Sequence, residues 1–139
     1  MAENIKLEVV TPETIVVSEE ANIVAAPGTL GEFGVLKGHT PFMTTLKTGT
    51  IRYTDANGTE HYIFVSGGFA EALPDKVTIL AESAERRRDI DLERAMAALE
   101  RAQQRVVTDR KKEEIDFVRA RGALERALHR VKLAESGKR

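Results

Sequence analysis

The sequence predicts an α+β protein in which a sheet domain comes first and a pair of helices follows. All four prolines, eight of the ten glycines and four of the five phenylalanines precede residue 85. The rest of the chain is dense in Ala, Leu, Glu and Arg, which are helix-favouring or helix-compatible residues. The spacing of apolar residues also changes there, from every second residue to every third or fourth. We therefore divide the chain into residues 1–84 and 85–139.

Short runs of alternating or β-branched residues predict the strands of the first part. Ile5, Leu7 and Val9 alternate with polar neighbours, and Thr11-Pro12 ends this run. The other predicted strands are residues 14–17, 22–26, 51–54, 61–65 and 77–81. Strands of this length and spacing favour a sandwich or a flattened barrel.

Glycines mark the turns of the predicted sheet. Asn57-Gly58 stands between two of the runs and is a strong signal for a hairpin. Gly67 and Gly68 predict positive φ angles or a close approach of two backbones.

Helical spacing predicts two helices, at residues 89–107 and 113–133, with Asp89 as the N-cap of the first. The polar connection 108–112 is short, so the helices should lie antiparallel. Their apolar stripes are thin, and Gly122 weakens the second helix. We expect a hairpin that is marginally stable by itself. The stripe residues are Leu92, Met96, Leu99, Val106, Phe117, Leu124, Leu128 and Val131.

Charge is distributed unevenly between the two parts. Residues 1–84 hold 5 Lys and Arg against 11 Asp and Glu, whereas residues 85–139 hold 16 against 11, so the parts carry charges of −6 and +5. The basic excess can attract a polyanion or an acidic partner, or can simply form a solvated helix face. Nucleic acid is disfavoured because no aromatic residues alternate with the basic ones.

Catalytic and metal-binding patterns are lacking in the sequence. There is no cysteine, no phosphate-binding glycine loop and no nucleophile elbow around Ser66. His39, His61 and His129 are too scattered to form a metal site. No apolar run is long enough to span a bilayer, and the N-terminus lacks the pattern of a signal peptide. We expect a non-enzymatic protein with no required cofactor or metal, soluble or peripheral to a membrane.

Arginines form a ridge on each predicted helix, opposite its apolar stripe. Guanidinium groups bind phosphates through paired hydrogen bonds, so convergent ridges suit a nucleoside triphosphate. The same pattern also fits a solvated charged surface, and spacing leaves both interpretations open. The ridge residues are Arg94, Arg101, Arg105, Arg119, Arg126 and Arg130.

Three motifs resemble the epsilon subunits of bacterial F-type ATP synthases. They are PGTLGEFGVLKGHTPFMTTLKTGTIRY at 27–53, VSGGFAE at 65–71, and the pair DIDLERA and EIDFVRA at the starts of the two helices. The resemblance extends over essentially the whole chain. It implies a ten-stranded β-sandwich followed by a C-terminal antiparallel two-helix hairpin.

The resemblance also implies a role and partners. In that family the subunit is a non-catalytic part of the central stalk, or rotor, of a proton-translocating ATP synthase. It binds the gamma subunit and the ring of c subunits, peripherally at the cytoplasmic face of the bacterial inner membrane. Glu32 and His39 match the surface that faces these partners. The helical hairpin inhibits ATP hydrolysis when it extends into the alpha/beta catalytic hexamer.

Many bacterial members also bind ATP as a regulatory ligand, through a motif that stands intact here as Ile90-Asp91-Leu92-Glu93-Arg94-Ala95. The resemblance implies that arginines hold the phosphates while Glu85, Ile90 and Asp91 hold adenine and ribose. The alternative is a purely structural and inhibitory hairpin that binds no nucleotide. The implied ATP-binding residues are Glu85, Ile90, Asp91, Arg94, Ala95, Arg101, Arg126 and Arg130.

Overall fold

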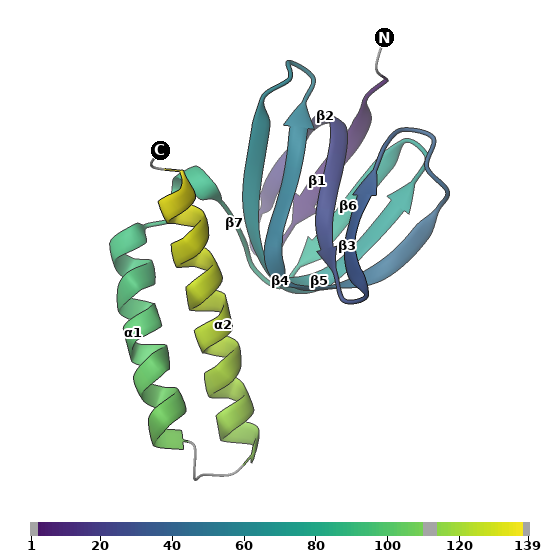
Figure 1. Ribbon diagram of the computed structural model, residues 1–139. Helices are drawn as coiled ribbons and strands as arrows, with labels where there is room; N and C mark the ends of the chain where they lie inside the picture. Colours follow the sequence, from purple (N-terminus) through teal and green to yellow (C-terminus); the bar gives the residue numbers. More distant parts are fainter. Residues whose placement is uncertain (1–2, 110–113, 138–139) are drawn as a thin grey trace. The chain divides into compact units, whose positions relative to one another are not determined.

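The chain divides into two compact units, Met1–Arg87 and Arg88–Arg139. The computed structural model describes residues 3–109 and 114–137. The first unit contains the strands and the second contains the helices (Figure 1). The division lies three residues beyond the predicted position 84, because residues 84–86 still form a strand of the sheet.

The sheet of the first unit closes on itself. Strands β1, β6, β5, β4 and β2 follow one another by hydrogen bonding, and β1 also pairs with β2, which completes a five-stranded barrel. β1 is parallel to β6 and antiparallel to β2. β3 extends the sheet beside β2, and β7 pairs with β5. The strands are β1 Ile5–Val10, β2 Ile15–Gly28, β3 Gly31–Val35, β4 Phe42–Asp55, β5 Glu60–Leu73, β6 Lys76–Ala81 and β7 Ala84–Arg86.

The expected ten-stranded sandwich is not what the described residues form, since they contain seven strands in one continuous sheet. The difference arises because β2, β4 and β5 are each 14 residues long. The predicted strands 14–17 and 22–26 are both parts of β2, which continues through register shifts instead of ending at them. Bulges of this kind bend a strand without terminating it.

The barrel interior follows the predicted alternation. Ile5, Leu7 and Val9 are fully buried, and every second residue of β1 faces the core. The Asn57-Gly58 hairpin is confirmed, with β4 and β5 paired on either side of it. Gly67 and Gly68 have φ angles of 113° and 128°. A Cβ at Gly68 would lie 2.0 Å from the carbonyl oxygen of Leu80, so both predicted reasons for glycine apply there.

The second unit is a pair of antiparallel helices, α1 Leu92–Asp109 and α2 Glu114–Ser136 (Figure 1). A short 3₁₀ turn, η1 Arg87–Asp89, precedes them. The N-cap of α1 is Asp91 and not the predicted Asp89, because the Asp91 carboxylate accepts a hydrogen bond from the Arg94 amide at 3.2 Å. No helix within the described residues is long and apolar enough to cross a bilayer. The predicted connection 108–112 lies partly outside those residues.

Small residues form most of the buried positions along the hairpin. Ala95 and Ala102 on α1, and Ala120 and Ala127 on α2, are each at least 94% buried and recur every seven residues along their helix. In contrast, Met96 of the predicted apolar stripe is 51% exposed. Val131 of the same stripe is buried, as predicted. Small side chains permit a close approach of two helices, so alanines make up most of the buried positions.

Candidate functional site: an arginine groove between two helices

A groove of about 230 Å³ runs between α1 and α2. Its floor consists of alanines, Ala98 and Ala102 from one helix and Ala123 and Ala127 from the other. Because these side chains are short, the two helices leave open space between the longer residues that border it. The bordering residues are Arg101, Arg105, Arg126 and Arg130.

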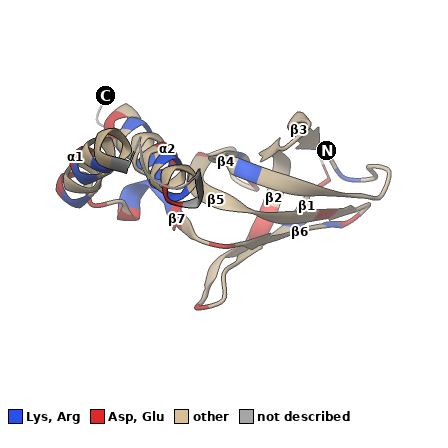
Figure 2. Ribbon diagram, turned by 90° about the horizontal axis from the view of Figure 1, so that it is seen from below, with Lys and Arg blue, Asp and Glu red and all other residues tan. Residues whose placement is uncertain are grey.

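The groove is strongly basic. Figure 2 shows Lys and Arg distributed along both helices, and four arginines line this one depression. Among the described residues, no carboxylate lies within ion-pair distance of Arg101, Arg105 or Arg126. Uncompensated guanidinium groups raise the local positive potential and can each offer two parallel hydrogen bonds. The arrangement is suited to a phosphate-bearing anion.

The structure brings together three of the eight residues that were expected to bind ATP, namely Arg101, Arg126 and Arg130. Arg105 borders the same groove but was absent from that set, although it belonged to the predicted ridge. A signal for it was present in the sequence, since Arg105 lies four residues after Arg101 and therefore one turn along the same face of α1.

The remaining expected ligand residues lie at or before the start of α1. Asp91 caps the helix, and Arg94 and Ala95 form its first turn, with Arg94 exposed and Ala95 buried. Ile90 is half-buried just before the cap. Glu85 is half-buried in β7, within the first unit.

Two residues were expected to face partner subunits. Glu32 lies in β3, and His39 lies in the segment that follows this strand. Glu32 in β3 accepts a hydrogen bond from Arg52 of β4, with 2.7 Å between the side-chain atoms. The His39 ring lies against Phe42, with 5.0 Å between ring centroids. The Glu32 side chain is exposed, whereas His39 is half-buried.

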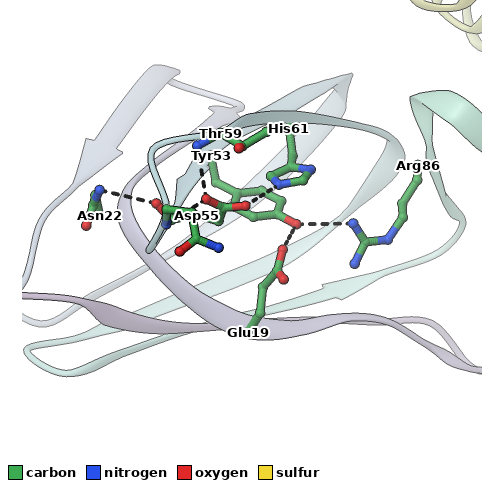
Figure 3. Close-up of polar contacts among 8 residues, drawn as sticks. Glu19, Asn22, Tyr53, Asp55, Thr59, His61 and Arg86 are labelled. Carbon is green, nitrogen blue, oxygen red and sulfur yellow. Dashed lines mark hydrogen bonds and ion pairs between the residues drawn. The ribbon is translucent and has the colours of Figure 1, made fainter.

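A polar network occupies one side of the barrel (Figure 3). The buried Tyr53 hydroxyl donates a hydrogen bond to Glu19 and accepts one from Arg86 at 3.2 Å. The ring of Tyr53 stacks on the His61 ring, with 4.8 Å between ring centroids. His61 in turn donates a hydrogen bond from Nε2 to Oδ2 of Asp55, with 2.8 Å between these atoms. This network connects β2, β4, β5 and β7 and was not predicted from the sequence.

The environment of this network shifts the pKa values of Tyr53 and Asp55. Burial raises the pKa of Tyr53 to about 12, and the hydrogen bond to Glu19 acts in the same direction while Arg86 opposes it. The hydrogen bond from His61 lowers the pKa of Asp55, with help from the backbone amide of Thr59. Tyr53 is therefore neutral and Asp55 ionised throughout the ordinary pH range.

Among the described residues, no group of three or more potential ligands could hold a metal ion. Ser66, the serine considered as a nucleophile, exchanges a hydrogen bond with Ser83 at 2.6 Å. This partner is another hydroxyl and cannot act as a general base near neutral pH. The residues that line the arginine groove are alanines and arginines, neither of which is a nucleophile.

Each of the two units matches a known protein family. Residues 4–87 match the family described as "ATP synthase, Delta/Epsilon chain, beta-sandwich domain". Residues 88–135 match "ATP synthase, Delta/Epsilon chain, long alpha-helix domain". The boundary between the matches coincides with the division between the two units.

Individual relatives agree with these family matches. The chain is 63% identical over 106 residues to the ATP synthase epsilon chain of Desulfosudis oleivorans, covering 76% of this chain and 80% of that one. It is 66% identical over 106 residues to the ATP synthase epsilon chain of Desulforapulum autotrophicum, and this match covers 76% of this chain and 78% of that one. Among solved structures, a chain of the Euglena gracilis mitochondrial ATP synthase (OSCP/F1/c-ring) superposes with a TM-score of 0.78 at 24% identity, covering 98% of this chain and 82% of that one.

The closed barrel and the basic helical hairpin each match a domain of an ATP synthase chain, so the protein is of the class of subunits that belong to a larger assembly. The chain belongs to the delta/epsilon family of ATP synthase subunits and, with these relatives, to the epsilon chains of the bacterial F-type enzyme.

Proposed function

We propose that this chain is a non-catalytic central-stalk subunit of a proton-translocating ATP synthase. In this role the barrel binds the gamma subunit and the c ring, with Glu32 and His39 on the contact surface. The hairpin regulates ATP hydrolysis by extending into the alpha/beta hexamer. Family membership supports this role, as does the likeness to a chain from an OSCP/F1/c-ring assembly. The subunit then sits peripherally at the cytoplasmic face of the bacterial inner membrane.

We further propose that the hairpin binds ATP as a regulatory ligand. The observation that carries this proposal is the groove bordered by Arg101, Arg105, Arg126 and Arg130. Guanidinium groups beside a narrow alanine floor are complementary to the negative charge of a triphosphate. Asp91, Arg94, Ile90 and Glu85 are assigned to the nucleoside and the adjoining phosphate on the strength of the family motif. ATP that contacts both helices stabilises the folded hairpin by mass action.

Isothermal titration of the full chain with ATP tests this proposal. We expect saturable binding, weakened by an Arg126→Ala substitution. Loss of one charge-assisted contact costs about 1.5–3 kcal/mol, or roughly tenfold to a hundredfold in Kd. The matched control is Arg121→Ala, which removes the same charge from α2. Arg121 lies over the Phe117 ring and lines a different groove, so this substitution should leave Kd nearly unchanged.

A second candidate is a hairpin that inhibits hydrolysis without sensing nucleotide. Its arginines then contact acidic surfaces of the hexamer. This alternative predicts that the full chain lowers ATP hydrolysis by an alpha–beta–gamma complex while a chain ending at Arg87 does not, and that ATP gives no heat with the isolated chain. Absence of heat at millimolar ATP would eliminate the sensor and leave the inhibitory role standing.

A further inference from the structure

The turn between β4 and β5 carries a chemically labile pair of residues. Of the three asparagines in the sequence, Asn57 alone precedes a glycine, whereas Asn4 and Asn22 each precede an isoleucine. Asn57 and Gly58 are both exposed to water. An asparagine side chain is open to attack by the next backbone nitrogen when that nitrogen belongs to glycine, which has no side chain to shield it. A β-branched residue at the following position hinders the same approach.

The reaction that this pair can undergo is a cyclisation followed by hydrolysis. The Gly58 backbone nitrogen attacks Cγ of Asn57, so that a new C–N bond forms while the bond from Cγ to Nδ2 breaks. The proton of the Gly58 amide leaves with Nδ2 as ammonia. Water then opens the cyclic imide at either of its carbonyl groups, which gives aspartate or isoaspartate at position 57. The only co-reactant is water, which reaches both exposed residues.

The folded turn holds the reacting groups in an unreactive arrangement. The Gly58 amide donates to the Asp55 carbonyl at 3.0 Å, and the Asp55 amide donates to the Thr59 carbonyl at 2.8 Å. Gly58 has a φ angle of 85°. These features define a short hairpin loop in which a type I turn is followed by a glycine with positive φ. Cyclisation must break the bond from Gly58 to Asp55, because the nitrogen has to turn toward the Asn57 side chain and lose its proton.

The Asp55 carboxylate fixes the same turn from its inner side. Its Oδ1 accepts hydrogen bonds from the Asn57 amide at 2.9 Å and from the Thr59 amide at 3.0 Å. Its Oδ2 accepts another from Nε2 of His61 at 2.8 Å (Figure 3). The carboxylate is half-buried and ionised, which strengthens these bonds. Rotation of the peptide between Asn57 and Gly58 therefore disturbs several bonds to one residue at once.

We propose that Asn57 is a site of spontaneous deamidation and that Asp55 controls its rate by keeping the turn closed. Modification proceeds through the fraction of molecules in which this end of the β4–β5 hairpin has opened. Aspartate at position 57 adds a negative charge two residues from the Asp55 carboxylate. Isoaspartate adds one carbon to the backbone of a loop whose length fixes the pairing of β4 with β5. Either product weakens this end of the hairpin.

Peptide mapping by mass spectrometry tests the proposal on the full chain, aged in mildly alkaline buffer. Deamidation should occur at Asn57, and it should be at least about tenfold slower in the folded chain than in the same chain unfolded in guanidinium chloride, because only opened turns react. Asn57→Gln should abolish it, since a glutamine side chain must close a larger ring. Asn4 and Asn22 should stay unmodified over the same period and serve as internal controls.

Two substitutions test the part assigned to Asp55. Asp55→Ala removes the acceptor of three side-chain hydrogen bonds and should accelerate deamidation of the folded chain about tenfold. The matched control is Glu60→Ala, which removes an exposed carboxylate of the same hairpin that lies beside Tyr62 and not in the turn. Its deamidation rate should stay within about twofold of the wild type.

Asp55→Asn serves if the alanine variant fails to fold, as judged by circular dichroism. It retains an acceptor oxygen without the charge and should give a smaller acceleration in the same direction. The proposal is overturned if the folded and unfolded chains deamidate at the same rate, or if Asn57 stays intact in the unfolded chain. It is also overturned if the folded Asp55 variants behave like Glu60→Ala.

Discussion

At the scale of single residues, Tyr53 makes the stability of the barrel depend on alkaline pH. In an unfolded chain a tyrosine hydroxyl ionises near pH 10, whereas burial raises the pKa of Tyr53 in the folded protein to about 12. Between these values the folded protein retains a proton that the unfolded chain has released. Rising pH therefore favours unfolding, and the stabilisation that the neutral hydroxyl provides is fully present only below about pH 10.

We expect the free energy of unfolding to fall by about 2 kcal/mol from this group as the pH rises from about 10 to 12. Urea titrations of wild type and Tyr53→Phe across that range measure the effect. The difference between the two proteins is the informative quantity, because all other titrating groups are shared. Parallel stability curves over this interval would show that Tyr53 ionises equally easily in both states.

Residue spacing predicted part of the candidate site and missed the rest for a physical reason. Arg101, Arg126 and Arg130 were named in advance and do border one groove. Helical projection placed the arginines opposite the larger apolar residues, but it gave no weight to alanines as contact positions. Arg105 belonged to the predicted ridge but not to the set implied by the family motif. The alanine floor depends on how two helices meet, which the period of one helix cannot specify.

At the scale of elements, Gly122 is a weak point in α2. Glycine in a helix interior costs roughly 0.5–1 kcal/mol relative to alanine. A Cβ at this position would lie 3.2 Å from Nη1 of Arg126, the far end of a flexible side chain that can move aside. Gly122→Ala should therefore stabilise the hairpin by about this amount, which slows amide exchange in α2 roughly twofold to fivefold.

The control for this substitution is Ala97→Gly, at an exposed position of α1. It makes the opposite change in helix propensity and should accelerate exchange in the hairpin by a similar factor. Faster exchange in Gly122→Ala would mean that Arg126 cannot yield and that the groove, not helix propensity, determines the residue at position 122.

The elements themselves were predictable where the signal is local. Asn57-Gly58 fixed the β4–β5 hairpin, and the positive φ angles at Gly67 and Gly68 agree with expectation. Strand number was not predictable, because β2 continues through the gap between the predicted strands 14–17 and 22–26. Whether a chain bends or stops at such a place is decided by its neighbours across the sheet.

At the scale of the whole molecule, the two units differ in what holds them together. The barrel encloses large apolar side chains such as Ile51, Ile63 and Ile79, all fully buried. The hairpin contact is built mainly on alanine, whose methyl group contributes only about 0.8 kcal/mol when buried. The barrel should be the more stable unit and should not depend on the hairpin for its fold.

A chain ending at Arg87 tests this expectation. Its melting midpoint, followed by circular dichroism, should lie within about 5 °C of the barrel transition in the full chain. Amide exchange in the full chain should be faster in α1 and α2 than in β1, β4 and β5. A truncated chain that is unfolded, or that melts more than about 10 °C lower, would show that the barrel depends on residues beyond Arg87.

The parallel pairing of β1 with β6 has a consequence for how the protein is made. β1 can pair with β2 early during synthesis, but its other edge finds a partner only after Lys76–Ala81 has left the ribosome. Until then the nascent chain exposes an unpaired strand edge, the feature most prone to wrong association. β7 and the helices follow directly after β6, so the nascent barrel can close before the helical hairpin is complete.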